Sequence, residues 1–142
     1  IISRFGEDLN GFTFGIWGLA FKPGTDDMRE APAIYVIKEL VKRGAKIKAY
    51  DPKSMHEAKT HYLKGLKNIE YLDSKYLVLR DSDALVLLTE WKEFRSPDFK
   101  QIKKELKNPV IFDGRNQYIA YDLENKGLDY FRIGKNKYYK NE

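Results

Sequence analysis

The stretch from residue 18 to residue 32, GLAFKPGTDDMREAP, carries the densest set of side chains that could bind a charged ligand. Lys22 and Arg29 lie near the expected start of a helix, where free backbone N–H groups add to the attraction for an anion such as phosphate. The same stretch holds three acids, Asp26, Asp27 and Glu30. These acids would repel phosphate unless they pair with basic side chains or cap the helix. The residues therefore leave two interpretations open, a phosphate site and a capped loop with internal ion pairs.

A second basic loop is expected at residues 113–116, DGRN. Gly114 permits a tight turn, and Arg115 can hold a phosphate or a carboxylate through two parallel hydrogen bonds. Such a turn is also common between two elements, so a purely structural role stays open. An anion site gains support if both basic loops lie on one edge of a sheet.

Other candidate side chains favour structural roles. Asp51 ends an expected strand, where a dinucleotide-binding protein would hold a ribose, but the GxGxxG pattern is absent and a structural turn is favoured. His56 and His61 face different sides of an expected helix, which argues against a metal site. Trp17 and Trp91 are more typical of core packing than of base stacking. No nucleophile elbow and no HExxH motif is present, so no catalytic group is evident.

The elements that must position these residues are short apolar runs alternating with helical stretches. Strands are expected at 12–20, 45–50, 69–72, 84–89, 109–112 and 128–133. Helices are expected at 31–43, 54–63, 74–80, 96–106 and 118–126, with Ser96 as the cap of the fourth.

This alternation predicts an α/β fold. We expect a doubly wound, Rossmann-like three-layer sandwich with a mostly parallel sheet covered on both faces. Ligands of such sheets bind at the carboxyl ends of the strands. The loops to inspect are therefore 20–29, 51–53, 89–91 and 113–116.

Composition narrows the class of protein. The chain has 142 residues, of which 42% are hydrophobic and 33% charged, enough for one domain with a real core. The absence of cysteine excludes a disulfide scaffold, a Cys-ligated metal site and a cysteine nucleophile on this chain, and it fits a reducing compartment such as the cytoplasm. No apolar run approaches the ~20 residues of a membrane span, so no membrane partner is expected. The net charge of +5 favours anions weakly, and residues 135–142 predict a solvated tail rather than a nucleic-acid site.

Residues 18–32 closely resemble the signature of the UDP-glucose/GDP-mannose dehydrogenase family, at the start of its C-terminal domain. Further matching residues follow in the family's order: Phe5-Gly6, Leu9-Asn10-Gly11, Tyr50-Asp51-Pro52, Asp83-Ala84 and Asp113-Gly114-Arg115-Asn116. The resemblance covers roughly residues 5 to 134.

The resemblance implies that three domains of a longer enzyme have separate functions. In this family an N-terminal Rossmann domain binds NAD, a central helical region carries the catalytic cysteine and joins a homodimer, and the C-terminal domain closes over the UDP moiety. The whole enzyme oxidises the C6 alcohol of a nucleotide sugar twice, through a thiohemiacetal and a thioester on that cysteine, with NAD as the oxidant. This chain would supply only the third part and would be inactive alone. We expect residues 1–10 to end the linking helix, residues 11–134 to form the UDP-binding domain, and residues 135–142 to be a disordered basic tail.

The resemblance also implies roles for individual residues. Phe21 and Lys22 match family positions that contact the UDP-sugar, and Arg115 matches an arginine that reaches the substrate. Arg29 matches one that reaches NAD across the domain interface. The acids of the same loop would then hold the loop and orient Lys22 or Arg29. No catalytic or metal-binding residue is expected on this chain.

The expected partners are a nucleotide sugar and the rest of the same polypeptide. UDP-glucose is the favoured sugar, and close variants of the motifs occur in GDP-mannose and UDP-N-acetylmannosamine dehydrogenases. A freestanding nucleotide-binding module without catalysis is the alternative from another class.

Overall fold

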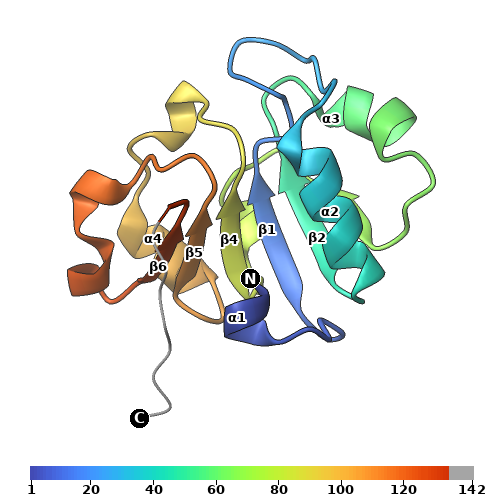
Figure 1. Cartoon of the computed structure of the whole chain (residues 1–142). Helices are drawn as coiled ribbons and strands as arrows, with labels where there is room; N and C mark the ends of the chain where they lie inside the picture. The colour runs from blue at the N-terminus through green and yellow to red at the C-terminus, as the bar shows by residue number, and fades with distance from the viewer. Residues whose placement is uncertain (135–142) are drawn as a thin grey trace.

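Six parallel strands form the sheet that carries the candidate residues. The structure, a computed structural model, describes residues 1–134. Its strands are β1 (Thr13–Trp17), β2 (Lys46–Tyr50), β3 (Ile69–Tyr71), β4 (Ala84–Leu87), β5 (Val110–Asp113) and β6 (Asp129–Arg132). Every pairing is parallel, and the strand order is β3-β2-β1-β4-β5-β6 (Figure 1). The predicted α/β fold with a doubly wound parallel sheet is confirmed.

Helices and single turns connect the strands. They are α1 (Ile2–Phe5), α2 (Pro32–Lys42), α3 (Met55–Glu57), the π-helix η1 (Ala58–Tyr62), α4 (Phe99–Glu105), and the 3₁₀ helices η2 (Leu77–Leu79), η3 (Lys92–Phe94), η4 (Ile119–Tyr121) and η5 (Leu123–Lys126). Helix α2 forms as predicted, because Pro32 suits its first turn and Ile37 and Leu40 are buried against the sheet. Gly44, with a φ of +100°, follows its last turn.

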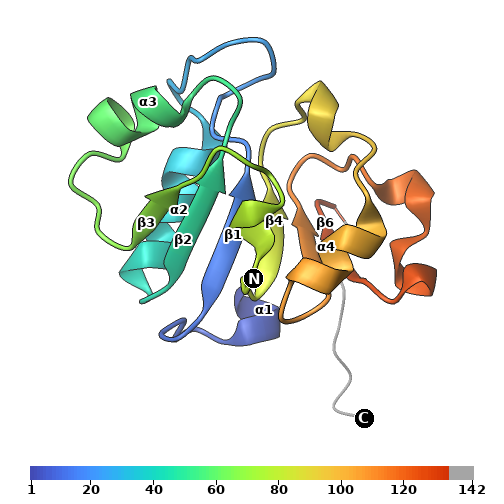
Figure 2. The same ribbon diagram turned by 180° about the vertical axis from the view of Figure 1, so that it is seen from behind.

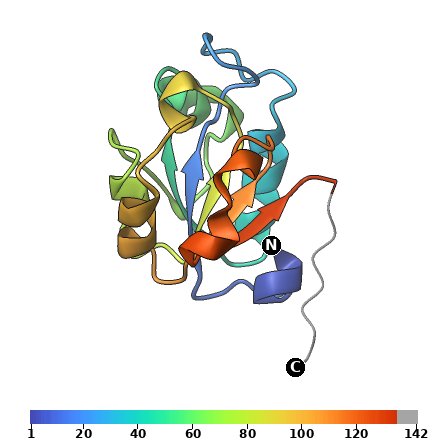
Figure 3. The same ribbon diagram turned by 90° about the vertical axis from the view of Figure 1, so that its left-hand side faces the viewer.

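The sheet buries a separate apolar cluster on each face. On one face Phe14 and Ile16 of β1 pack with Ile37 of α2. On the other face Trp17 packs with residues of η2 and α4, and its ring stacks on Phe94 with centroids 5.0 Å apart. In Figure 3 the sheet accordingly lies between α2 on one side and η2 and α4 on the other.

The reverse face is covered only in part. Here η2 lies against β1 and β2, and α4 packs with β4 and β5, whereas the edge strand β3 faces the viewer in Figure 2 with no helix in front of it. The predicted cover on both faces is therefore incomplete only at this edge strand of the described sheet. Its exposed position, Glu70, is charged and needs no cover.

Three expected helical features differ in the structure. The helices predicted at 74–80 and 118–126 are only 3₁₀ turns, η2 in the first segment and η4 and η5 in the second. In the second segment Asp122 has a φ of +52°, which ends one turn before the next begins. Helix α4 is capped not by Ser96 but by Asp98, whose Oδ1 accepts a hydrogen bond from the Gln101 N–H at 3.1 Å. The hydroxyl of Ser96 is instead hydrogen-bonded to that of Tyr121 at 2.9 Å.

The N-terminal helix packs on this core through Phe5, whose ring centroid lies 5.4 Å from that of Phe14. Helix α1 precedes the sheet, and the predicted basic tail at 135–142 lies outside the described residues. None of the helices in residues 1–134 combines the length and the apolar character that crossing a membrane requires.

Candidate functional site

Four loops meet along one edge of the sheet, at the top of Figure 1, because the strands are parallel and end on the same side. These loops follow β1, β2, β4 and β5. The chain leaves β1 towards β2 on one side and β4 towards β5 on the other, although β1 and β4 are neighbours. This reversal is the switch point at which doubly wound sheets bind ligands. All predicted site residues lie on the loops of this edge.

The carboxylate of Asp51 joins three of the loops. Its Oδ2 accepts hydrogen bonds from the N–H groups of Leu19 (2.8 Å) and Ala20 (3.0 Å) and from the indole of Trp91 (2.9 Å). Its Oδ1 accepts from the N–H groups of Lys53 and Ser54, each at 2.8 Å. Asp51 is completely buried, so the predicted structural turn is confirmed and a ribose-binding role for this side chain is excluded.

Gly18 lets the β1 loop cross the β4 loop at close range. A Cβ atom at this position would lie 2.5 Å from Cβ of Thr89 and 2.6 Å from its N and Oγ1. The Thr89 hydroxyl donates a hydrogen bond of 2.6 Å to the Ala20 carbonyl. The first glycine of the motif is therefore required by packing at the switch point.

Phe21 and Lys22 follow at once and project from this fixed segment. The Phe21 side chain is 41% exposed, although its N–H is bound to the Asp27 carbonyl at 2.9 Å. The Lys22 ammonium lies 5.6 Å from the centroid of the Phe21 ring. No carboxylate of residues 1–134 forms an ion pair with Lys22, so its charge is available to a ligand.

Arg29 is oriented by Asp27 within the same loop. Its Nε and Nη2 donate to the carboxylate of Asp27 at 2.9–3.2 Å, and 79% of the Arg29 side chain stays exposed. The hydrogen bonds from Arg29 lower the pKa of the Asp27 carboxyl, and the carboxylate in turn raises the pKa of Arg29. The ion pair predicted inside this loop is confirmed for these two residues.

Arg115 forms a similar pair with a residue that sequence reasoning did not single out. Its Nε and Nη2 donate to the two carboxylate oxygens of Glu90, on the loop after β4. The backbone N–H of Arg115 donates to Asp113 Oδ1 at 3.0 Å, and the Gly114 N–H donates to the Leu87 carbonyl at 2.8 Å. The loops after β4 and β5 are thereby docked on each other, and the pair with Glu90 raises the pKa of Arg115.

Two open hollows lie beside these loops. One is lined by Phe21, Asp27, Arg29, Glu30, Ile34, Tyr35 and Tyr62, and the other by Gly24, Thr25, Asp26 and Lys53. The first brings together two of the predicted residues, Phe21 and Arg29, with exposed aromatic surface. Arg115 lines neither hollow and is separated from them along the sheet edge by the width of the β4 loop.

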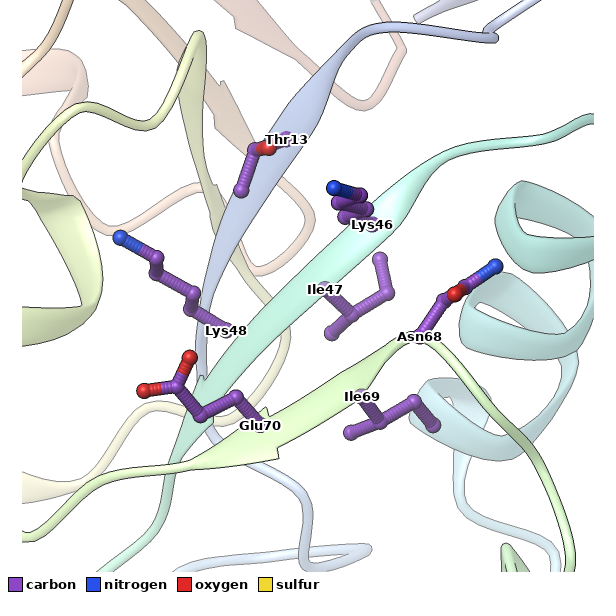
Figure 4. Close-up of a pocket in the computed structure, with 7 residues that line it drawn as sticks. All are labelled: Thr13, Lys46, Ile47, Lys48, Asn68, Ile69 and Glu70. Atoms are coloured by element: carbon purple, nitrogen blue, oxygen red, sulfur yellow. The ribbon is translucent and has the colours of Figure 1, made fainter.

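A third hollow lies away from this edge, at the amino-terminal halves of β1, β2 and β3 (Figure 4). Lys48 and Glu70 border it, and the Lys48 ammonium donates to the Arg80 carbonyl at 2.7 Å. None of the predicted site residues lines this hollow. It serves below as a reference surface for control substitutions.

The remaining candidates are structural. Trp17 is fully buried in the core, and Trp91 is bound to Asp51. His61 Nε2 lies 3.8 Å from Oε2 of Glu57, four residues earlier in the chain. Within the described part of the chain no cluster of three or more His, Asp or Glu side chains suits a metal ion.

The arrangement suits an anionic ligand with a flat or apolar part. Within residues 1–134 no carboxylate forms an ion pair with Lys22, and Nη1 of Arg29 and of Arg115 stays unbound beside their carboxylate pairs. Phe21 offers an aromatic face. Fixed cations of this kind neutralise phosphate groups.

The family model for the "UDP-glucose/GDP-mannose dehydrogenase family, UDP binding domain" matches residues 15–120. UDP-glucose 6-dehydrogenase of Pseudomonas aeruginosa is 40% identical over 127 residues, which are 88% of this chain and 28% of that protein. The enzyme of the same name from Rhizobium meliloti is 38% identical over 135 residues, 95% of this chain and 30% of its own length. The chain thus spans less than a third of these relatives.

Solved structures agree in fold. The UDP-glucose dehydrogenase from the hyperthermophilic archaeon Pyrobaculum islandicum superposes with a TM-score of 0.72 at 28% identity, over 92% of this chain and 27% of the other. The NDP-N-acetyl-D-galactosaminuronic acid dehydrogenase from Methanosarcina mazei superposes with a TM-score of 0.75 at 29% identity, over 94% of this chain and 27% of the other. The match to the family model covers most of the six-stranded sheet and all four loops of its carboxyl edge. The chain belongs to the UDP-glucose/GDP-mannose dehydrogenase family, of which it is the UDP-binding domain.

Proposed function

We propose that this chain binds the UDP part of a nucleotide sugar as one domain of an NAD-dependent UDP-glucose 6-dehydrogenase. The observation that carries the proposal is the exposed Lys22 beside Phe21 at the switch point, which forms no ion pair within residues 1–134, in a chain 38–40% identical to proteins of that name. In such an enzyme the nucleotide sugar is oxidised from UDP-glucose to UDP-glucuronate.

Each predicted residue has a role that its surroundings support. The Lys22 ammonium pairs with a phosphate of the ligand, since no carboxylate of residues 1–134 forms an ion pair with it. The Phe21 ring packs on the base or the sugar. Arg115 binds a phosphate or the sugar through the part of its guanidinium that Glu90 leaves free.

The rest of the activity belongs to other parts of a longer polypeptide. The oxidant NAD and the nucleophilic cysteine would be held there, since this chain has no cysteine. Arg29 fits a phosphate of NAD that reaches it from another domain, because most of its side chain is exposed and only one edge of its guanidinium is bound to Asp27. In the same proposal residues 1–10 end the helix that links the domains, and the complete enzyme is a homodimer.

Calorimetric titration of the 142-residue chain with UDP tests the proposal. We expect saturable binding of UDP and weaker binding of uridine, which lacks the phosphates. Lys22→Ala should weaken UDP binding about tenfold or more, the usual value of one hydrogen bond to a charged group. Lys46→Ala is the matched control, because Lys46 is an exposed lysine on the hollow of Figure 4, far from this edge.

Three results would overturn the proposal. Equal affinity for UDP and uridine would show that the cations do not bind the phosphates. Equal losses of UDP affinity in Lys22→Ala and Lys46→Ala would mean that Lys22 acts only through the net charge of the chain. A preference for GDP over UDP would replace the proposed sugar nucleotide by that of a GDP-mannose dehydrogenase.

A further inference from the structure

Glu90 holds one edge of the Arg115 guanidinium. The contact is side-on: Nε bonds to Oε2, and Nη2 bonds to Oε1 at 3.1 Å. A guanidinium carries five N–H groups in a plane, so this pairing uses two of them. The two hydrogens of Nη1 and one of Nη2 remain, and one hydrogen from each of these nitrogens forms the second fork of the same side chain.

The pair is supported from both sides. Glu90 follows Leu88 and Thr89, which are buried, and Arg115 follows a turn fixed by Asp113 and by the Gly114 bond to Leu87. Only 20% of the Glu90 side chain and 33% of the Arg115 side chain are exposed. A partly buried ion pair between two anchored loops restricts the rotamers of Arg115 far more than an exposed pair would.

We propose that Glu90 is a positioning residue for Arg115, which holds the guanidinium by its Nε edge and presents the Nη1–Nη2 fork to a phosphate of the nucleotide. The inference rests on the proposed function and deepens it. Glu90 does not touch the ligand. It fixes the arginine before the ligand arrives, so that binding does not have to order a long, flexible side chain.

The same arrangement occurs at Arg29, whose Nε and Nη2 are bound by Asp27. The two arginines lie on different loops, and each is held by a carboxylate at the same edge of the guanidinium. A competing anion would occupy the fork that a ligand needs. Here both carboxylates leave the end-on fork of the arginine unbound.

Two substitutions separate position from charge. Glu90→Gln keeps the shape and removes the charge, and Glu90→Asp keeps the charge but shortens the side chain so that both oxygens cannot reach Arg115. Positioning predicts that both variants weaken UDP binding about two- to twelvefold, the cost of ordering one long side chain. The matched control is Glu93→Gln, which removes a charge from the same loop at a residue bound to Tyr50 instead of Arg115.

A spectroscopic measurement on the unsubstituted chain gives an independent test. The Nε–H of Arg115 should give a slowly exchanging NMR signal, because it is bound to Glu90, and the signal should persist when UDP saturates the site. In Glu90→Gln the exchange should accelerate while the backbone amide spectrum of the core stays unchanged.

Several outcomes would overturn the inference. Tighter UDP binding by Glu90→Gln would make Glu90 a competitor of the ligand, and so would loss of the Arg115 Nε–H signal on addition of UDP. If Glu93→Gln weakened UDP binding as much as Glu90→Gln, the effect would come from net charge and not from the position of Arg115. Failure of the unsubstituted chain to bind UDP would instead refute the proposed function, which distinguishes the two.

Discussion

Asp51 shows how one buried side chain can organise a binding edge without contacting a ligand. Its two oxygens accept backbone N–H groups from the loops after β1 and β2 and the indole N–H of Trp91 from the loop after β4. An ionised carboxylate accepts at both oxygens and donates at neither. An amide of the same shape accepts at only one of them.

Asp51→Asn should therefore destabilise the chain severely. The new NH₂ group would face either the two donors on the β2 side or the three donors on the other, and each buried donor left unpaired costs about 1–3 kcal/mol. We expect a loss of about 3 kcal/mol or more in the free energy of unfolding, measured by urea denaturation. Asp73→Asn, the same change at an exposed position, should cost less than about 0.5 kcal/mol. A loss at Asp51 as small as this would contradict the role assigned to its carboxylate.

Individual site residues were predictable where their partner was close in the sequence. The pair of Asp27 and Arg29 lies within one loop, so charge balance alone suggested it. Glu90 and Arg115 are 25 positions apart and meet only because β4 and β5 are neighbours. The loop at 89–91 was expected at the binding edge, but its acid had no visible partner until the strand order was known.

At the scale of elements, the crossing of the β1 and β4 loops is the tightest contact of the edge. Gly18 has a φ of +99°, and the space where its side chain would lie is occupied by Thr89. Gly24, in the same signature, has a φ of +86° but no atom within 4 Å of an added Cβ. Gly24 is therefore required only by its backbone conformation, whereas Gly18 is required both by its conformation and by the lack of space for a side chain.

Gly18→Ala should cost far more than Gly24→Ala. Left-handed backbone alone costs a non-glycine residue about 1–2 kcal/mol, which is the loss expected at Gly24. At Gly18 an overlap with Thr89 backbone adds a further amount of about 1–3 kcal/mol. The difference in urea midpoint between the two variants measures the contact of Gly18 with Thr89. Equal losses of stability in the two variants would mean that the loops after β1 and β4 can separate freely.

The strands and α2 were predictable from sequence because their apolar positions repeat with the period of the element. The segments 74–80 and 118–126 have apolar residues at helical spacing too, but this spacing is only a weak determinant of the backbone, which tertiary context overrides. Tertiary contacts then decide the backbone. The Trp17 indole N–H donates a hydrogen bond of 2.7 Å to the Lys75 carbonyl. The Val78 carbonyl oxygen lies 2.7 Å from the position that a Cβ atom on Gly15 would occupy. Such contacts leave no periodic trace in the sequence.

At the scale of the whole molecule, the sheet half built on β5 and β6 is tied together by phenol groups. Tyr118, which is fully buried, donates to the Phe94 carbonyl at 2.5 Å, and Tyr130 donates to Asp113 at 2.7 Å. On the other half Tyr50 donates to Glu93 at 2.8 Å. Each hydroxyl needs its proton for the bond. Burial is the largest cause that raises the pKa of all three phenols, and the neighbouring carboxylates add to it.

These shifts predict a steep loss of stability in alkali. Below pH 10 the phenols keep their protons in both the folded and the unfolded chain, so their contribution is fully present. Above about pH 10 the unfolded chain releases these protons first, and the free energy of unfolding falls by about 1.4 kcal/mol per pH unit for each raised tyrosine. Burial also raises the pKa of Tyr71, to about 12, so its contribution is lost over the same range.

Urea denaturation of the chain between pH 8 and about pH 12 measures this slope. Tyr118→Phe should lower the stability at pH 8 through the lost hydrogen bond and reduce the alkaline slope by about 1.4 kcal/mol per pH unit, because one titrating phenol is gone. Tyr35→Phe, which removes the hydroxyl of a side chain that is 62% exposed, is the matched control for the loss of a tyrosine. An unaltered slope in Tyr118→Phe would mean that the Tyr118 hydroxyl ionises as readily in the folded chain as in the unfolded one, and the β5–β6 half would then be open to solvent at high pH.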